Sequence, residues 1–119
     1  MSSQIEVLNP ATGLAIGTVD NASITDCLHA VDMAHDAFVP WKNTAPRVRA
    51  EMLRKAFDIM IAEQEELART ITLEMGKVLS DARAEVAYAA EFFRWFSEEA
   101  VRIDGDYRRA PSGSNWLLV

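Results

Sequence analysis

Apolar residues recur every three or four positions through most of the chain, the spacing that places them on one side of a helix. This pattern predicts three helices, at residues 23–39, 45–76 and 80–103. Ser23 and Asp26 have the spacing of an N-terminal capping box, and Pro40 is expected to stop the first helix. A break is expected near Gln64 in the second helix, and Gly76 is expected to cap its end.

The second and third helices have their own start signals. Pro46 suits the first turn of the second helix, where a missing N–H is harmless. Ser80 and Asp81 supply a cap and an acid at the start of the third, which Asp104 and the residues after it are expected to end. The stripe that the second helix is expected to bury consists of Leu53, Ala56, Phe57, Met60 and Ile61.

Two short β-prone runs precede the helices and flank a cluster of turn-forming residues at 9–13. They predict a β-hairpin over residues 5–19, which must lie against another element because an isolated hairpin is only marginally stable. At the other end, residues 107–119 combine a loop at Pro111 to Gly113 with a final β-prone run. The fold class is therefore mostly α with an N-terminal β-hairpin.

The third helix is apolar on two opposite sides. At 100° per residue, one side carries Val86, Ala90 and Phe93. The nearly opposite side carries Tyr88, Phe92 and Trp95, and a narrow polar strip of Glu91, Arg94 and Glu98 lies between them. A helix of this kind is usually covered on both sides.

One hairpin and two other helices would struggle to cover both sides. We therefore expect the chain to be incomplete on its own, with the second aromatic side facing another subunit, a missing domain or a ligand. The alternative is that the other helices bury everything, as in small bundles with a continuous core helix.

Charge and composition narrow the class of partner. The 119 residues carry a net charge of −6 with a pI of about 4.8. An acidic surface repels phosphate, so we expect neither a nucleic acid nor a membrane as a partner. A single cysteine and an N-terminus without a basic start or an apolar run favour a cytoplasmic protein without a secretory signal.

Residue chemistry gives no catalytic centre. The sequence lacks both a GxGxxG motif and a phosphate loop. His29 and His35 have no companion cluster of ligands and are expected to be polar residues on a helix surface. Cys27 is expected to be a small buried hydrophobe rather than a nucleophile. We therefore expect this chain to contain no catalytic and no cofactor-binding residue.

The order of several short segments resembles the N-terminal portion of an aldehyde dehydrogenase. These segments are Leu-Asn-Pro-Ala-Thr-Gly at 8–13, Phe-Val-Pro-Trp at 38–41, Leu-Arg-Lys-Ala at 53–56, Thr-Leu-Glu-Met-Gly-Lys at 72–77 and Phe-Phe-Arg-Trp-Phe at 92–96. Residues 87–106 are most similar to the succinate-semialdehyde branch. Val78 departs from the family, which usually has a proline after the Gly-Lys pair, and the change should alter local stiffness more than activity.

The resemblance implies an oxidoreductase that converts an aldehyde, here succinate semialdehyde, to a carboxylic acid with NAD or NADP. It implies an N-terminal fragment, residues 1–119, of an α/β fold, in which these helices belong to the cofactor domain and residues 107–119 start the oligomerisation strand. The family's nucleophilic cysteine, its glutamate and its cofactor-clamping residues all follow the matched stretch. The chain alone is therefore expected to bind no cofactor and to be inactive.

The resemblance also implies two kinds of site residue. Tyr88, Phe92 and Trp95 correspond to a region that lines the aldehyde entrance tunnel in relatives, with core or interface packing as the alternative. Val7 or Leu8, together with Glu74, correspond to a monovalent cation site, with a surface carboxylate as the alternative for Glu74.

Two further interpretations require no catalytic residue in this chain. The chain could be a helical module that binds a protein partner through Tyr88, Phe92 and Trp95, or a non-catalytic partner of a full-length dehydrogenase. The small-molecule aldehyde would then belong to the full-length enzyme alone. If the chain is instead a fragment, the open apolar side predicts self-association or a missing C-terminal region, whereas a self-sufficient module would be a compact monomer.

Overall fold

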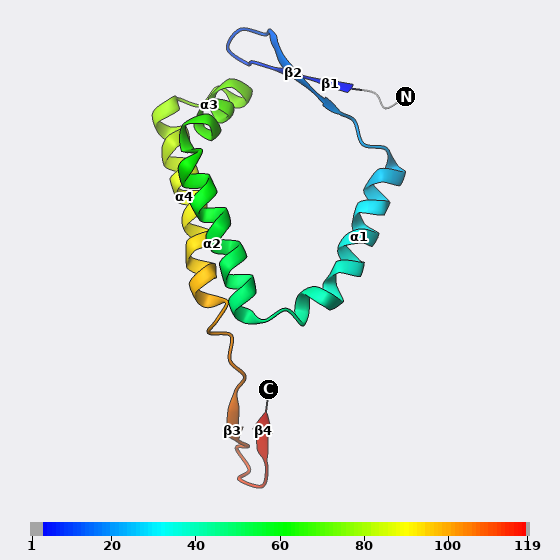
Figure 1. Ribbon diagram of the computed structural model, residues 1–119, viewed down its shortest axis with the longest axis vertical. Coiled ribbons are helices and arrows are strands. Elements are labelled where there is room, and N and C mark those ends of the chain that lie inside the picture. Colours follow the sequence, from blue (N-terminus) through cyan, green and yellow to red (C-terminus); the bar gives the residue numbers. More distant parts are fainter. Residues whose placement is uncertain (1–3, 119) are drawn as a thin grey trace.

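The computed structural model describes residues 4–118 and contains four helices between two β-hairpins (Figure 1). In chain order the elements are β1 (Gln4–Leu8), β2 (Ala15–Asp20), α1 (Ile24–Lys42), α2 (Pro46–Ala62), α3 (Gln64–Met75), α4 (Leu79–Glu99), β3 (Tyr107–Arg109) and β4 (Trp116–Leu118). The expectation of a mostly helical chain with an N-terminal hairpin is confirmed. Val119, the last residue of the segment expected at 107–119, lies outside the described residues.

The N-terminal hairpin is antiparallel, and its turn is built by local hydrogen bonds. The Asn9 side chain accepts a bond of 2.9 Å from the backbone N–H of Ala11. The N–H of Gly13 donates to the Asn9 carbonyl at 2.7 Å, and Gly13 has a φ of 70°, which glycine adopts without strain. The pairing shifts register between Val7 and Leu8.

The capping box predicted at the start of α1 is confirmed. The Asp26 backbone N–H donates to Ser23 Oγ at 3.2 Å, and the Ser23 N–H donates to the Asp26 carboxylate at 2.9 Å. The Ser23 hydroxyl also donates to the Asp26 carboxylate at 2.7 Å, and this bond, followed by the one from the Ser23 N–H, holds the pKa of Asp26 below its usual value.

The expectation that Pro40 stops α1 is wrong, since the helix continues to Lys42. Pro40 lies in the last turn, where few further hydrogen bonds depend on it. Side chains beyond the helix also satisfy its final carbonyls: Asn43 donates to the Val39 carbonyl and Thr44 to that of Pro40, both at 3.0 Å.

Helix α1 stands apart from the other three helices (Figure 1), and none of its residues is buried. The apolar stripe that predicted it is therefore open to solvent. The exposed fractions are 81% for Ile24, 62% for Leu28, 66% for Val31 and 58% for Phe38. Capping and helical spacing form this helix, but contacts with the rest of the chain do not cover it.

Helices α2 and α3 are separated at Glu63, beside the break expected at Gln64. Pro46 is the first residue of α2, as predicted, and Gly76 caps α3 with a φ of 75°. The expected buried stripe of α2 is only half-buried at Leu53, Ala56, Phe57 and Met60. Ile61 was wrongly assigned to it, because its side chain is 42% exposed.

Helix α4 begins and ends earlier than predicted. Its N-cap is Val78, without a side-chain hydrogen bond, so Ser80 is not the cap. The helix ends at Glu99, not at residue 103. Two acids, Glu98 and Glu99, lie at its negative end, and Val101 is β-branched, so the last residues gain little from continuing the helix.

Small residues allow α4 to pack closely against two helices. It runs antiparallel to α2 (Figure 1), and its N-terminal half contacts α3. The buried residues at these contacts are Ala50, Ala68, Ala82, Val86, Ala90 and Ser97. In the described part of the chain no large side chain is fully buried, so this core is thin.

The C-terminal segment forms a second hairpin, in which the residues expected to form a loop at Pro111 to Gly113 separate the two strands. Strands β3 and β4 pair antiparallel, with Arg109 opposite Trp116. The rings of Tyr107 and Trp116 stack with centroids 4.8 Å apart and planes at 9°. The turn-forming residues around Gly113, whose φ is 75°, reverse the chain between the strands.

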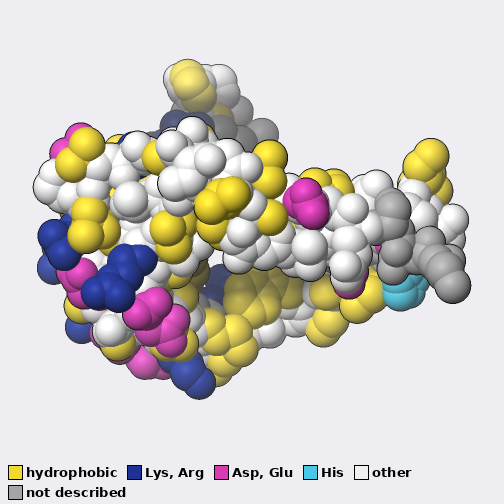
Figure 2. All heavy atoms as spheres, turned by 90° about the horizontal axis from the view of Figure 1, so that it is seen from above, with side chains coloured by type: hydrophobic (Ala, Val, Ile, Leu, Met, Phe, Trp, Pro, Cys, Tyr) yellow, Lys and Arg dark blue, Asp and Glu magenta, His cyan; other side chains and the backbone are white. Residues whose placement is uncertain are grey.

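The molecule exposes far more surface than a self-contained protein of its mass. Its accessible surface is 9536 Å², whereas a folded monomer of 13.3 kDa exposes about 6,500 Å². Its radius of gyration is 21.3 Å, against about 13.5 Å for a compact domain of this length. On the face shown in Figure 2, hydrophobic side chains accordingly spread over the surface, while the visible charged side chains gather mainly at one end. The expectation that the chain is structurally incomplete is confirmed.

None of the helices in residues 4–118 combines the length and hydrophobicity that crossing a bilayer requires.

Candidate functional site

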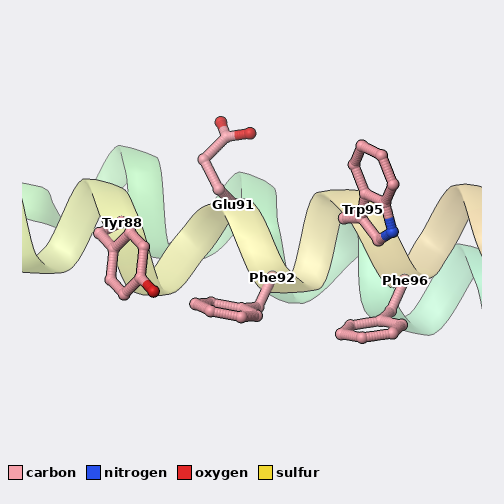
Figure 3. A pocket seen from close by; sticks show the side chains of 5 residues that line it. All are labelled: Tyr88, Glu91, Phe92, Trp95 and Phe96. Carbon is pink, nitrogen blue, oxygen red and sulfur yellow. The ribbon is translucent and has the colours of Figure 1, made fainter.

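A shallow aromatic hollow runs along the outward side of α4. It measures about 340 Å³ and is lined by Tyr88, Glu91, Phe92, Trp95 and Phe96. In Figure 3 the side chains of Glu91 and Trp95 project to one side of the helix and those of Phe92 and Phe96 to the other, leaving the hollow between them. The helical repeat explains the grouping, since these positions are three or four residues apart.

The three aromatic residues predicted for this side are open to solvent. Tyr88 is 67% exposed, Phe92 48% and Trp95 63%. Tyr88 and Phe92 contact each other edge to face, with centroids 5.0 Å apart and planes at 86°. The prediction that residues of this chain do not enclose them is therefore confirmed.

Sequence reasoning missed two residues of the hollow, Phe96 and Glu91. Phe96 follows Phe92 by one turn and could have been found from that spacing. It also joins Phe92, Phe93 and Leu53 of α2 around a neighbouring apolar hollow of about 310 Å³. The aromatic surface therefore continues toward the crevice between α2 and α4.

Glu91 brings the single acidic group to the hollow, and Arg94 pairs with it. Arg94 Nε and Nη2 lie 2.8 and 2.6 Å from Glu91 Oε2. The two side chains are each about half exposed. The predicted polar strip on this helix thus contains an ion pair at the edge of the aromatic surface.

A second hollow, of about 260 Å³, lies between the N-terminal hairpin and α3. Its lining includes Val7 and Glu74, two of the three residues expected at a cation site, but not Leu8. The only charged residue among those that line it is Glu74. Within residues 4–118, no group of three or more His, Cys, Asp or Glu residues could hold a metal ion.

The cysteine and the two histidines of the chain lie on α1, and none of them lines the hollows described above. The Cys27 thiol is exposed, so the expectation that it is buried is wrong, because α1 packs against no other helix. His29 and His35 are exposed helix-surface residues, as predicted.

The aromatic hollow does not fit the pyrophosphate of a nicotinamide dinucleotide. Such a cofactor needs backbone N–H groups of a glycine-rich turn, or cations, around its pyrophosphate. The aromatic hollow instead offers the carboxylate of Glu91, which repels phosphate. We therefore assign no step of the chemistry to a cofactor at this hollow.

Comparison with known proteins gives a consistent relationship along the whole chain. The model of the Aldehyde dehydrogenase family matches residues 1–118. A succinate-semialdehyde dehydrogenase of Paenarthrobacter nicotinovorans is 52% identical over 104 residues, which are 87% of this chain and 23% of that protein. A glutarate-semialdehyde dehydrogenase of Pseudomonas aeruginosa is 46% identical over 102 residues, or 86% of this chain and 21% of that protein.

Solved structures have the same fold over this region. The succinate-semialdehyde dehydrogenase of Burkholderia pseudomallei gives a TM-score of 0.89 at 37% identity, covering 98% of this chain and 24% of that one. A betaine aldehyde dehydrogenase of Staphylococcus aureus, solved in complex with NAD+, gives 0.87 at 26% identity, covering 92% and 22%. The chain thus spans less than a quarter of the length of the curated relatives it matches.

Proposed function

This chain belongs to the aldehyde dehydrogenase family, and we propose that it forms the N-terminal part of an enzyme that oxidises succinate semialdehyde to the dicarboxylic acid with NAD or NADP. The observation that carries the proposal is the match over residues 1–118, which includes a succinate-semialdehyde dehydrogenase at 52% identity. The same proposal places the enzyme in the reducing cytoplasm, which suits a chain with a free thiol at Cys27.

Within this enzyme, we assign the aromatic residues of α4 to the substrate path. Tyr88, Phe92 and Trp95 form one wall of the aldehyde entrance tunnel, and Phe96 extends it. Their exposure supports this role, because a wall must remain accessible on the side that the substrate passes. The opposite wall, the nucleophile and the cofactor site belong to the part of the relatives that this chain does not cover.

The chain also contributes a site for a monovalent cation between the first hairpin and α3. Backbone oxygens at Val7 or Leu8 and the carboxylate of Glu74 would supply its ligands. Support comes from the hollow that Val7 and Glu74 share, and from the preference of such cations for oxygen. The site is structural in this proposal and takes no part in the chemistry.

The surplus surface supports a proposal about what covers these helices. The chain exposes about 3,000 Å² more than a folded monomer of its mass. A standard protein–protein interface buries only about 800 Å² on each partner, so the surplus is several times larger. We therefore assign this surface to the remaining three-quarters of a dehydrogenase subunit. Without it, the apolar surfaces lead the chain to self-associate, and an added full-length dehydrogenase would be its natural partner.

A chimera tests the proposal directly. Residues 1–118 are joined to the remainder of the Paenarthrobacter enzyme. Reduction of NAD or NADP is then followed with succinate semialdehyde, glutarate semialdehyde or betaine aldehyde as the substrate. We expect the chimera to turn over, with succinate semialdehyde preferred, and the 119-residue chain to stay at background. The unmodified Paenarthrobacter enzyme is the positive control.

Two results would contradict the proposal. Turnover by the 119-residue chain alone would show that it has catalytic groups of its own. A chimera that folds as the parent does but oxidises no aldehyde would remove the assignment, and would favour a helical module that binds a protein through its aromatic side. Sedimentation of the isolated chain separates these cases further, because a self-sufficient module is a compact monomer.

A further inference from the structure

We propose that Arg94 sets the charge preference of the aromatic hollow by masking the carboxylate of Glu91, so that the hollow no longer repels an anionic aldehyde and attracts a cationic one less strongly. The inference rests on the proposed role of this surface as a substrate wall. It assigns a specificity function to an ion pair that touches none of the reacting atoms.

The lining of the hollow, taken without Arg94, has the chemistry of a cation site. Four aromatic side chains surround it, and the faces of such rings attract ammonium groups. Glu91 adds a full negative charge at the rim (Figure 3). A trimethylammonium group would be attracted by both features, whereas the carboxylate of succinate semialdehyde would be repelled by Glu91.

The geometry of the pair explains why this preference is suppressed. Arg94 Nε and Nη2 both contact Glu91 Oε2, at 2.8 and 2.6 Å, so the guanidinium lies directly against the negative charge. At this separation the two charges nearly cancel at the distance of a bound substrate. Because the two positions are three residues apart on one helix, the pair does not depend on any other element of the chain.

Kinetics of the chimera described above test the inference. In an Arg94→Gln variant we expect kcat/KM to fall roughly three- to tenfold for succinate semialdehyde and to rise by a similar factor for betaine aldehyde. The change should lie mainly in KM and should shrink in high salt, where exposed charges are screened. The double variant Glu91→Gln, Arg94→Gln should restore the parent ratio.

Arg102→Gln is the matched control. Arg102 pairs with Glu99 at 3.0 Å across the same three-residue spacing, but neither residue lines the hollow. This variant should leave the ratio of the two substrates unchanged. An Arg94→Gln chimera with the parent ratio, or a double variant that fails to restore it, would overturn the inference while leaving the proposed function intact.

A measurement without catalysis decides the matter even if the chimera is inactive. In the 119-residue chain, Trp41→Phe and Trp116→Phe leave Trp95 as the single tryptophan. We expect Arg94→Gln to increase quenching of its fluorescence by caesium and decrease quenching by iodide, each by about twofold, with the double variant reversing both changes. Equal quenching in the parent chain and the Arg94→Gln chain would show that Arg94 masks nothing at this surface.

Discussion

Arg83 of α4 donates two hydrogen bonds to the carboxylate of Glu65 of α3, from Nε to Oε1 at 2.7 Å and from Nη2 to Oε2 at 2.9 Å. Gln64 adds a third contact, since its side-chain amide donates to the Arg83 carbonyl at 3.0 Å. The start of α3 is thereby joined to α4 by paired, directional contacts at the surface. The pair lowers the pKa of Glu65, chiefly through the hydrogen bonds from Arg83, and raises that of Arg83.

The depressed pKa of Glu65 makes the packing of α3 on α4 sensitive to acid. A carboxyl group whose pKa is lower in the folded than in the unfolded chain stabilises the fold at pH values above its unfolded-state pKa. This stabilisation is lost as the pH falls through its folded-state pKa. We expect the melting temperature to fall between roughly pH 5 and pH 3, and to fall less in Glu65→Gln. Circular dichroism at a series of pH values measures this.

Arg54→Gln serves as the control for that measurement. Arg54 and Asp58 form a pair of 3.3 Å within α2, so this ion pair does not itself join two helices. Its pH profile should follow that of the parent chain. A Glu65→Gln chain with the parent profile would mean that the Arg83 contact contributes nothing to stability.

Removal of the capping box should loosen α1 without unfolding the rest. Ser23→Ala deletes the hydroxyl that accepts from the Asp26 N–H, and a lost cap of this kind costs about 1 kcal/mol. Because α1 is not packed against α2, α3 or α4, we expect faster hydrogen exchange at its first turns and an unchanged melting of α2 to α4. Ser80→Ala, at a position that is not a cap, should change neither. Unaltered exchange in Ser23→Ala would disprove the role of the box.

At Gly76, both the backbone conformation and the contact with a neighbouring residue favour glycine. Its φ of 75° suits glycine, and a β-carbon there would lie 3.1 Å from Pro10 Cγ in the turn of the first hairpin. We expect Gly76→Ala to destabilise the chain by about 1–2 kcal/mol, measured by urea denaturation. Gly13→Ala, with a φ of 70° and no neighbour within 4 Å, isolates the backbone cost. Equal losses in both variants would show that Pro10 is not in contact.

A substitution in the exposed apolar stripe of α1 should have different effects in the isolated chain and in the chimera. In the isolated chain Leu28 is 62% exposed, so Leu28→Ala should change the stability by less than about 0.5 kcal/mol. In the chimera, where the remainder of the subunit covers α1, the same substitution should cost about 2–5 kcal/mol. Val86→Ala, in the packed core, should be destabilising in both. A Leu28→Ala cost that is small in both proteins would exclude burial of α1 in the larger enzyme.

Local signals in the sequence predicted the local structure well. The Ser23–Asp26 box, Pro46 at the first position of α2 and the left-handed Gly76 cap all depend on residues close in sequence. The prediction for the end of α1 was wrong because other residues offset the helix-breaking effect of a single proline. Pro40 did not end α1, because its place in the last turn and the caps from Asn43 and Thr44 removed most of its cost.

The candidate site was predicted in part. The helical repeat of α4 placed Tyr88, Phe92 and Trp95 on one side and required no tertiary information. It could not show that Glu91 also lines the hollow, because the side-chain direction of a residue at the border between two helix faces depends on its contacts. The contact with Arg94 supplied that direction.

By itself, the sequence determined which helices and turns form and that α4 carries more apolar surface than its neighbours can cover, because spacing, caps and side-chain size act over a few residues. Only the tertiary structure decided which side of α4 is closed. Ala82, Val86 and Ala90 let α2 and α3 approach, while the bulky rings opposite them stay outside. The physical reason is that burial depends on which surfaces meet, and small residues permit the closest approach of two helices.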